Sequence, residues 1–240
     1  MALVTTDAVV LHVFDYLESS RVLRLATREH GVQSVLAKGA RRSQRRFGSA
    51  LDLFAEGSAQ YYARAGRDLH TLGAFEVTRA RVALGADLER FAAAAALAEL
   101  VLRVAREESG PPWYAALVDG LDLLAAASAG EARTAGLAAA WRLVGALGFA
   151  PTLDACGNCH EPIAPDRPAR FSHPAGGALC ERCGRLTGVG RVLPPEARAV
   201  LRTWLAEPDA AGPHGDGRGV GAPTLVPLDA PTARAHQRLL

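Results

Sequence analysis

The sequence predicts an α+β protein of several domains: an N-terminal β-barrel, a central α-helical domain, a cysteine-rich metal-binding insert and a C-terminal helix. Three observations predict this order. Residues 1–79 hold short β-branched segments, residues 80–150 are rich in alanine and leucine, and all four cysteines lie within residues 151–190. Residues 191–240 contain one helical segment and a glycine- and proline-rich tail. These four ranges are the predicted domains.

Five strands are predicted in the first domain, whose first three segments are rich in β-branched residues and roughly alternate in hydrophobicity. They span Ala8–Phe14, Arg21–Ala26, Val32–Ala37, Leu51–Ala55 and Ala59–Arg64. Turn signals separate them at intervals of about 8–12 residues, as in small barrels and sandwiches. Five strands within residues 1–79 are most typical of an OB-fold barrel.

Helices are predicted where leucine and alanine dominate and where glycine, serine or proline ends the pattern. The predicted helices are Asp87–Glu107, Pro111–Ala127, Glu131–Leu147 and, after a proline pair, Glu196–Ala206. Residues 208–223 contain three prolines and five glycines, which predicts a loop or linker.

Cys156, Cys159, Cys180 and Cys183 form two C-x2-C pairs separated by 20 residues. Two such turns can place four thiolates at the corners of a tetrahedron, so the spacing predicts a structural Zn2+ site. Iron in the same cage stays open. Two disulfides or a redox C-x2-C are less favoured: the N-terminus lacks signal-peptide features, and no βαβ pattern surrounds the cysteines. Four thiolates fill the coordination shell, which argues against catalytic zinc.

The charge balance and hydropathy favour a cytoplasmic protein without a membrane span. The formal net charge is +2. No uncharged run reaches the ~18 residues that a spanning helix needs, and residues 1–7 have neither a basic nor an apolar signal region.

A basic loop is the strongest functional signal in the first domain. Residues 30–51 contain five cations and no carboxylate, and the five are Lys38, Arg41, Arg42, Arg45 and Arg46. Clustered cations repel one another unless a polyanion screens them, and phosphates accept arginine in bidentate geometry. The loop therefore predicts DNA binding; the alternative is an ordinary solvated loop.

Residues elsewhere in the barrel could extend this surface. Arg21, Arg24 and Arg28 lie along the second strand, although alternation places Arg21 and Arg24 on opposite faces. The aromatic residues Phe54, Tyr61 and Tyr62 are candidates for base stacking, with burial in the core as the alternative.

Motifs of nucleic-acid enzymes are not found in the sequence, which favours binding without catalysis. It has no Walker A, HExxH or G-x-S-x-G motif. Asp119 and Asp122 lie about one helical turn apart and are interpreted as a solvated helix face. Two other classes stay open: a zinc-stabilised protein-interaction adaptor without direct DNA binding, and a nuclease.

Several segments, in order, resemble the RecO family of bacterial recombinational repair proteins. Residues 37–42, AKGARR, and 46–48, RFG, are similar to a segment of that family. So are 25–31, LATREHG, 147–156, LGFAPTLDAC, and 171–180, FSHPAGGALC. The C-terminus departs from the family, which usually ends in a longer helical segment.

The resemblance implies an N-terminal OB-fold, a helical domain and a zinc-finger-like insert. It also implies an ATP-independent, nucleoid-associated protein that binds single- and double-stranded DNA and anneals complementary strands. With RecR, such a protein helps to load RecA onto DNA coated by single-strand-binding protein. Carried onto this chain, the DNA contacts are those of the basic loop, with Arg21, Arg24 and Arg28 at its margin.

Overall fold

The structure is a computed structural model that describes residues 2–40, 47, 51–64, 66–105, 111–128, 130–206, 225 and 228–240. The chain forms two compact units, residues 1–126 and 127–240. The division falls between two helices of the predicted central domain. The predicted division into four domains is finer, and it stays a prediction.

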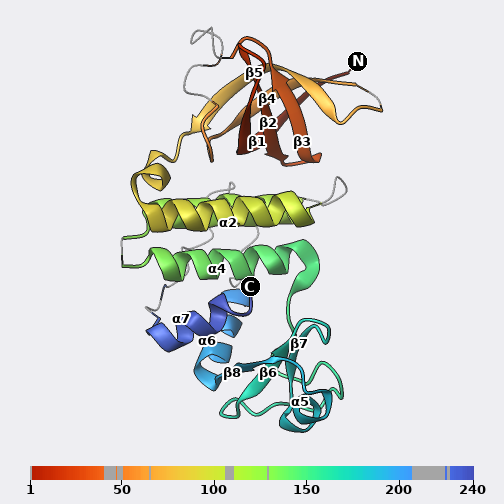
Figure 1. Ribbon diagram of the computed structural model, residues 1–240, viewed down its shortest axis with the longest axis vertical. Helices are drawn as coiled ribbons and strands as arrows, with labels where there is room; N and C mark the ends of the chain where they lie inside the picture. Colours follow the sequence, from red (N-terminus) through yellow and green to blue (C-terminus); the bar gives the residue numbers. More distant parts are fainter. Residues whose placement is uncertain are drawn as a thin grey trace, which may run out of the picture. The chain divides into compact units, whose positions relative to one another are not determined.

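The N-terminal unit contains a closed five-stranded barrel, so the predicted α+β class with an N-terminal barrel is confirmed (Figure 1). Its strands are β1 (Ala2–Tyr16), β2 (Ser20–Thr27), β3 (Gly31–Ala37), β4 (Glu56–Ala63) and β5 (Leu69–Arg79). They close in the order β1-β2-β3-β5-β4. All neighbours pair antiparallel except β3 and β5, which run parallel. This arrangement is consistent with the predicted OB-fold.

The predicted strand Leu51–Ala55 is wrong. The N–H of Phe54 donates to the carbonyl of Val10, and the N–H of Val10 donates to the carbonyl of Ala55. Phe54 itself adopts φ 67°, a left-handed conformation that ends the pairing. Leu51 and Phe54 are buried. The apolar character of these two residues therefore reflects packing in the core and not a strand.

The fifth strand, β5, was missed because its sequence carries His70, Gly73 and several polar residues. Gly73 lies where the register shifts, since Gln60 pairs with Ala74 and Tyr61 with Leu72. A Cβ on Gly73 would lie 3.3 Å from the carbonyl oxygen of Gln60. The glycine therefore marks a bulge and not the end of a strand.

Helices complete the N-terminal unit, namely η1 (Val82–Ala86), α2 (Leu88–Val104) and α3 (Pro111–Ala126). Asp87 caps α2 by accepting the N–H of Arg90 at 2.9 Å, as expected of an N-cap aspartate. The ring of Phe91 in α2 packs edge-on against Phe54 of the barrel, with centroids 5.8 Å apart. The predicted helices in this region are confirmed.

Arg81 joins the barrel to α3 through ion pairs in which its own guanidinium is buried and the carboxylates are partly exposed. Its guanidinium lies 2.6 Å from carboxylate oxygens of both Glu56 and Asp122, and it donates to the carbonyl of Phe54 at 3.0 Å. The Arg81 side chain is 1% exposed. Arg79 also contacts Asp122. The interpretation of Asp122 as part of a solvated helix face is therefore wrong, because tertiary partners that sequence spacing cannot show engage its carboxylate.

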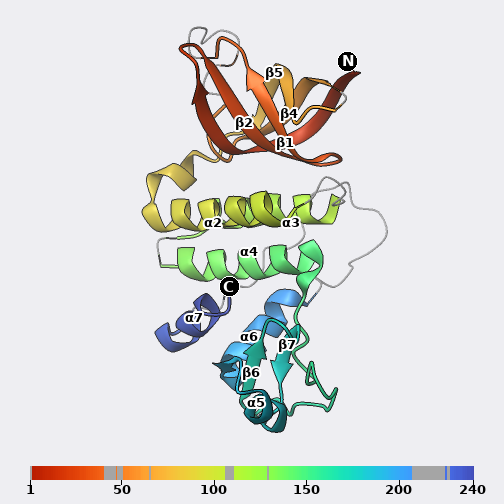
Figure 2. The same ribbon diagram turned by 45° about the vertical axis from the view of Figure 1, so that its right-hand side comes forward.

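The C-terminal unit packs helices against a small sheet (Figure 2). The helices are α4 (Ala132–Val144), which continues into η2 (Gly145–Phe149), and α5 (Glu181–Thr187), α6 (Pro195–Leu205) and α7 (Ala230–Gln237). The strands are β6 (Ala169–Ser172), β7 (Gly177–Leu179) and β8 (Arg191–Leu193). Trp141, Phe171 and Trp204 lie in one buried core.

Three features of this unit were not predicted: its short strands, α5 and α7. The strands lack a long alternating pattern, and α5 and α7 have only seven and eight residues. Asp229 caps α7 by accepting the N–H of Thr232 at 2.9 Å. None of the described helices combines the length and apolarity needed to cross a bilayer.

His236 of α7 is fully buried against Trp204, with ring centroids 4.7 Å apart. Burial lowers the pKa of His236 from 6.5 to about 4. The unfolded chain therefore binds a proton at higher pH than the folded unit does. We expect stability to fall as the pH drops from about 6.5 to about 4, with a maximum loss of about 3 kcal/mol from this group.

Chemical unfolding followed by tryptophan fluorescence at pH 7.5 and 4.5 measures this loss. The variant His236→Phe should lose less stability over that interval, whereas the exposed-site control His30→Gln should behave like the parent chain. An equal pH dependence in His236→Phe and the parent chain would contradict the assignment.

Candidate metal centre and cationic surface

The four cysteines converge on one point. Their Sγ atoms all lie within 4.8 Å of one another, and the Sγ atoms of Cys159 and Cys180 are 3.7 Å apart. Metal–sulfur bonds of about 2.3 Å in a tetrahedron require sulfur–sulfur distances of about 3.8 Å. Cys156 and Cys183 are buried, while Cys159 and Cys180 are half-buried. The cluster therefore fits a tetrahedral cation with four thiolate ligands, which is what the spacing predicts.

Local structure positions each pair of sulfurs. In the first turn, the N–H of Cys156 donates to the carbonyl of Glu161, and the N–H of His160 donates to the carbonyl of Cys156, both at 2.9 Å. The second pair follows β7, where the Cys180 sulfur caps α5 by accepting the N–H of Cys183 at 3.5 Å. Asn158 donates to the sulfur of Cys183 at 3.6 Å. These donors disperse thiolate charge.

Glycine is required where the first turn meets the β7 hairpin. A Cβ on Gly157 would lie 2.2 Å from the carbonyl oxygen of Ala175, and one on Gly177 would lie 2.2 Å from that of Thr152. The N–H of Gly157 donates to the carbonyl of Ala178 at 2.8 Å. Gly157 therefore joins the two halves of the site and does not donate to a sulfur.

The thiols of the cluster titrate differently from free cysteine. Burial raises the pKa of Cys156, but backbone N–H donors, including that of Cys159, outweigh it and lower the value to about 6. The N–H of Cys183 lowers the pKa of Cys180, but burial and the neighbouring sulfurs raise it to about 11. Cys156 therefore deprotonates readily, whereas burial and the neighbouring sulfurs oppose deprotonation of Cys180. A bound cation is needed to stabilise four thiolates together.

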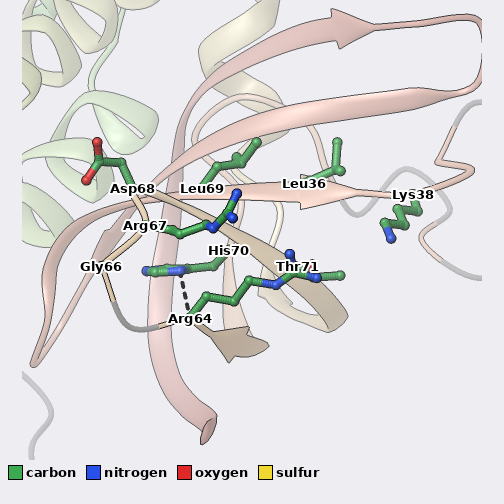
Figure 3. A pocket seen from close by; sticks show the side chains of 9 residues that line it. All are labelled: Leu36, Lys38, Arg64, Gly66, Arg67, Asp68, Leu69, His70 and Thr71. Carbon is green, nitrogen blue, oxygen red and sulfur yellow. Dashed lines mark hydrogen bonds between the residues drawn. The ribbon is translucent and has the colours of Figure 1, made fainter. Parts of the chain in front are cut away.

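On the barrel, the structure brings together cations from two segments that are distant in sequence. A groove between the end of β3 and the β4–β5 turn is lined by Lys38, Arg64, Arg67 and His70. Figure 3 shows the side chains of Arg64 and Arg67 extending from the turn along β5, on the side where Lys38 follows β3. The parallel pairing of β3 with β5 creates this neighbourhood.

The groove is cationic and open to solvent. Lys38, Arg64 and Arg67 are exposed, and none of them forms an ion pair within the described part of the chain. Asp68 is the acidic residue among those lining the groove. His70 is held in place, since its Nδ1 accepts the N–H of Arg64 at 3.4 Å and its Nε2 lies 3.0 Å from the amide oxygen of Gln33.

Sequence reasoning missed Arg64 and Arg67 as site residues. The available signal was weak: two arginines flank a glycine between strands, in the run Arg64-Ala-Gly-Arg67. Only the strand order shows that this turn faces the end of β3.

The four arginines of the basic loop, Arg41, Arg42, Arg45 and Arg46, lie outside the described residues. The residues that bound them are held by the barrel. The N–H of Gly39 donates to the hydroxyl of Ser20 at 3.4 Å, and Phe47 is buried in the barrel core. The last described residue before these arginines, Ala40, packs against the barrel core, and Phe47, which follows them in the sequence, is buried in the same core.

The three arginines of β2 and its turn differ in their surroundings. Arg21 lies 3.4 Å from Asp15, and Arg28 lies 3.0 Å from Asp7 and over the ring of Tyr114. Both ion pairs are exposed, so each contributes little stability and can be exchanged. Arg24 pairs with His12 and Ser34 in the sheet, half-buried. A DNA role for these three stays a prediction.

The three aromatic candidates for base stacking differ in how far they are buried. Phe54 and Tyr61 are buried, and Tyr61 stacks on His70 with centroids 5.5 Å apart. Burial first, and then the charge of Glu29, raises the pKa of Tyr61. Tyr62 is 41% exposed. Burial in the core, the alternative given for these aromatics, is therefore confirmed for Phe54 and Tyr61, whereas Tyr62 keeps an accessible ring.

The two parts of the chain match two family models. Residues 1–81 match the family described as recombination protein O N terminal, and residues 85–211 match recombination protein O C terminal. The barrel and the helical, cysteine-containing part thus define a protein of recombinational DNA repair.

Curated relatives support the same assignment over the full length. The chain is 38% identical to a DNA repair protein RecO of Anaeromyxobacter sp. (strain K), covering 99% of this chain and 88% of the relative. It is 36% identical to that of Myxococcus xanthus (strain DK1622), covering 83% and 88%, respectively. The chain belongs to the RecO family.

Proposed function

We propose that this protein binds single- and double-stranded DNA through the barrel, anneals complementary strands and performs no catalysis. One observation carries the proposal: Lys38, Arg64 and Arg67 line one exposed groove at the point where the basic loop begins. Cations on this rim would contact phosphates and release counterions, so binding would be sequence-independent and steeply salt-dependent.

The barrel is proposed to be an OB-fold, whose strands and loops commonly hold single strands. In this proposal the groove acts together with the loop arginines, which follow Lys38 in the sequence, as one cationic track for phosphates. Annealing requires that two polyanionic strands approach each other, and the track would lower their mutual repulsion. Arg21, Arg24 and Arg28 would contribute less, because carboxylates already accompany two of them.

The four cysteines are proposed to hold a structural Zn2+ that fixes the C-terminal unit. Family membership supports the proposed partners, which are RecR and single-strand-binding protein, and a role in loading RecA in the cytoplasm at the nucleoid.

The groove is tested with the full chain carrying Arg64→Gln and Arg67→Gln. We expect the slope of log affinity against log salt for a single-stranded oligonucleotide to fall by about 1.4, at about 0.7 for each lost phosphate contact. Annealing of complementary oligonucleotides, measured across a salt series without nucleotide, should slow in parallel.

The control is Arg103→Gln with Arg185→Gln, which removes the same charge from arginines paired with Glu99 and Glu181 on their own helices. It should leave the salt slope unchanged. A second variant, with Arg41, Arg42, Arg45 and Arg46 changed to alanine, tests the loop, and unchanged single-strand affinity would refute its assignment. If the parent chain bound no DNA but captured RecR, the adaptor alternative would replace the proposal.

A further inference from the structure

A second group of arginines lines a groove in the C-terminal unit. Arg170 of β6, Arg191 of β8, and Arg234 and Arg238 of α7 meet there, in a space of about 740 Å³. The side chains of Val192 and Pro231 form apolar parts of the groove wall. The described residues that line the groove include neither a carboxylate nor an aromatic side chain. Three segments that are separate in the sequence, β6, β8 and α7, thus form one cationic surface.

Two of these arginines are fixed by backbone carbonyls. Arg170 donates through Nε to Val189 at 3.2 Å and through Nη2 to Gly190 at 2.6 Å. Arg191 donates through Nη1 to the carbonyl of Arg238 at 2.5 Å. These hydrogen bonds hold the strands and the end of α7 together without neutralising either guanidinium, since carbonyls carry no net charge.

The other two arginines are presented to solvent. Arg234 and Arg238 are exposed and lie one helical turn apart at the end of α7. Asp229, which caps α7, is a carboxylate that the charge of Arg234 reaches. Its pKa is lowered first by hydrogen bonds from Thr232 and only then by the charge of Arg234. The groove therefore keeps a net positive charge.

We propose that this groove binds the phosphate backbone of a nucleic-acid strand, as a second contact besides the barrel. The inference rests on the proposed function and deepens it. Guanidinium groups match phosphate oxygens in bidentate geometry, and walls without aromatic side chains offer no stacking platform for bases. The contact is therefore made to phosphates alone and is independent of sequence.

The test uses the full chain with Arg234→Gln and Arg238→Gln, which spares the two arginines that hold the walls. For a single-stranded oligonucleotide we expect the salt slope to fall by about 1.4 and the affinity at low salt to fall on the order of tenfold. The pair Arg103→Gln and Arg185→Gln is again the control and should change neither. Combined with Arg64→Gln and Arg67→Gln, the losses should add, because the sites share no residue.

Each outcome separates this proposal from the function it rests on. An unchanged slope in the α7 variant, with normal loss in the barrel variant, overturns the second site and leaves the proposed function standing. A parent chain that binds no oligonucleotide removes both. If the control variant loses as much salt slope and affinity as the α7 variant, net charge alone explains the effect, and the proposed binding site in this groove is overturned. Lost affinity for polyglutamate, with oligonucleotide binding intact, would assign the groove to an acidic peptide instead.

Discussion

Replacing Cys156 with serine is expected to abolish stoichiometric zinc binding and to destabilise the C-terminal unit by several kcal/mol. Structural zinc contributes its binding free energy to folding, about 10–16 kcal/mol in zinc-finger peptides. Cys156 is fully buried, so the remaining three sulfurs would lie around an incomplete shell. Metal content after dialysis, and thermal unfolding followed by tryptophan fluorescence, measure the two effects.

The matched control is Asn158→Ala, which removes a donor to the Cys183 sulfur and leaves all four ligands. It should retain metal with about 10–100-fold weaker affinity. Full stoichiometric metal in Cys156→Ser would show that the ligand set is wrong. Visible ferric–thiolate absorption from the purified protein would assign the cage to iron.

Replacing Arg81 with methionine is expected to destabilise the N-terminal unit by up to about 3–5 kcal/mol, the cost of removing one partner from a fully buried ion pair. The change leaves the carboxylates of Glu56 and Asp122 without their buried cation. Arg81 adopts φ 36°, and methionine inherits that backbone conformation, so strain does not account for the loss. Urea unfolding at neutral pH measures it.

Arg79→Met is the control for Arg81 because both arginines contact the same two carboxylates. The Arg79 side chain is 54% exposed, so its loss should cost less than about 1 kcal/mol. Equal effects of the two substitutions would contradict the role of burial. Below the unfolding transition, neither should alter the salt slope of DNA binding, because neither residue lies in the cationic groove.

The sequence by itself determined the features that depend on local pattern and spacing. Two C-x2-C pairs have few geometries available to them, and the four sulfurs do converge. The β-branched segments of β1, β2 and β3 and the alanine- and leucine-rich helices formed where the periodicity predicts them. Several contiguous runs in order, among them residues 37–42 and 147–156, also carried the family resemblance, because each is local in the sequence.

Only the tertiary structure decided which distant residues meet. The parallel pairing of β3 with β5 places Lys38 beside Arg64 and Arg67, and packing of α7 beside β8 places Arg234 with Arg191. Tertiary packing likewise buries Phe54 and Tyr61 in the core, and it places the buried side chain of Arg81 beside Asp122. Such contacts join residues that are far apart along the chain, so they depend on strand order and packing, which local propensity does not encode.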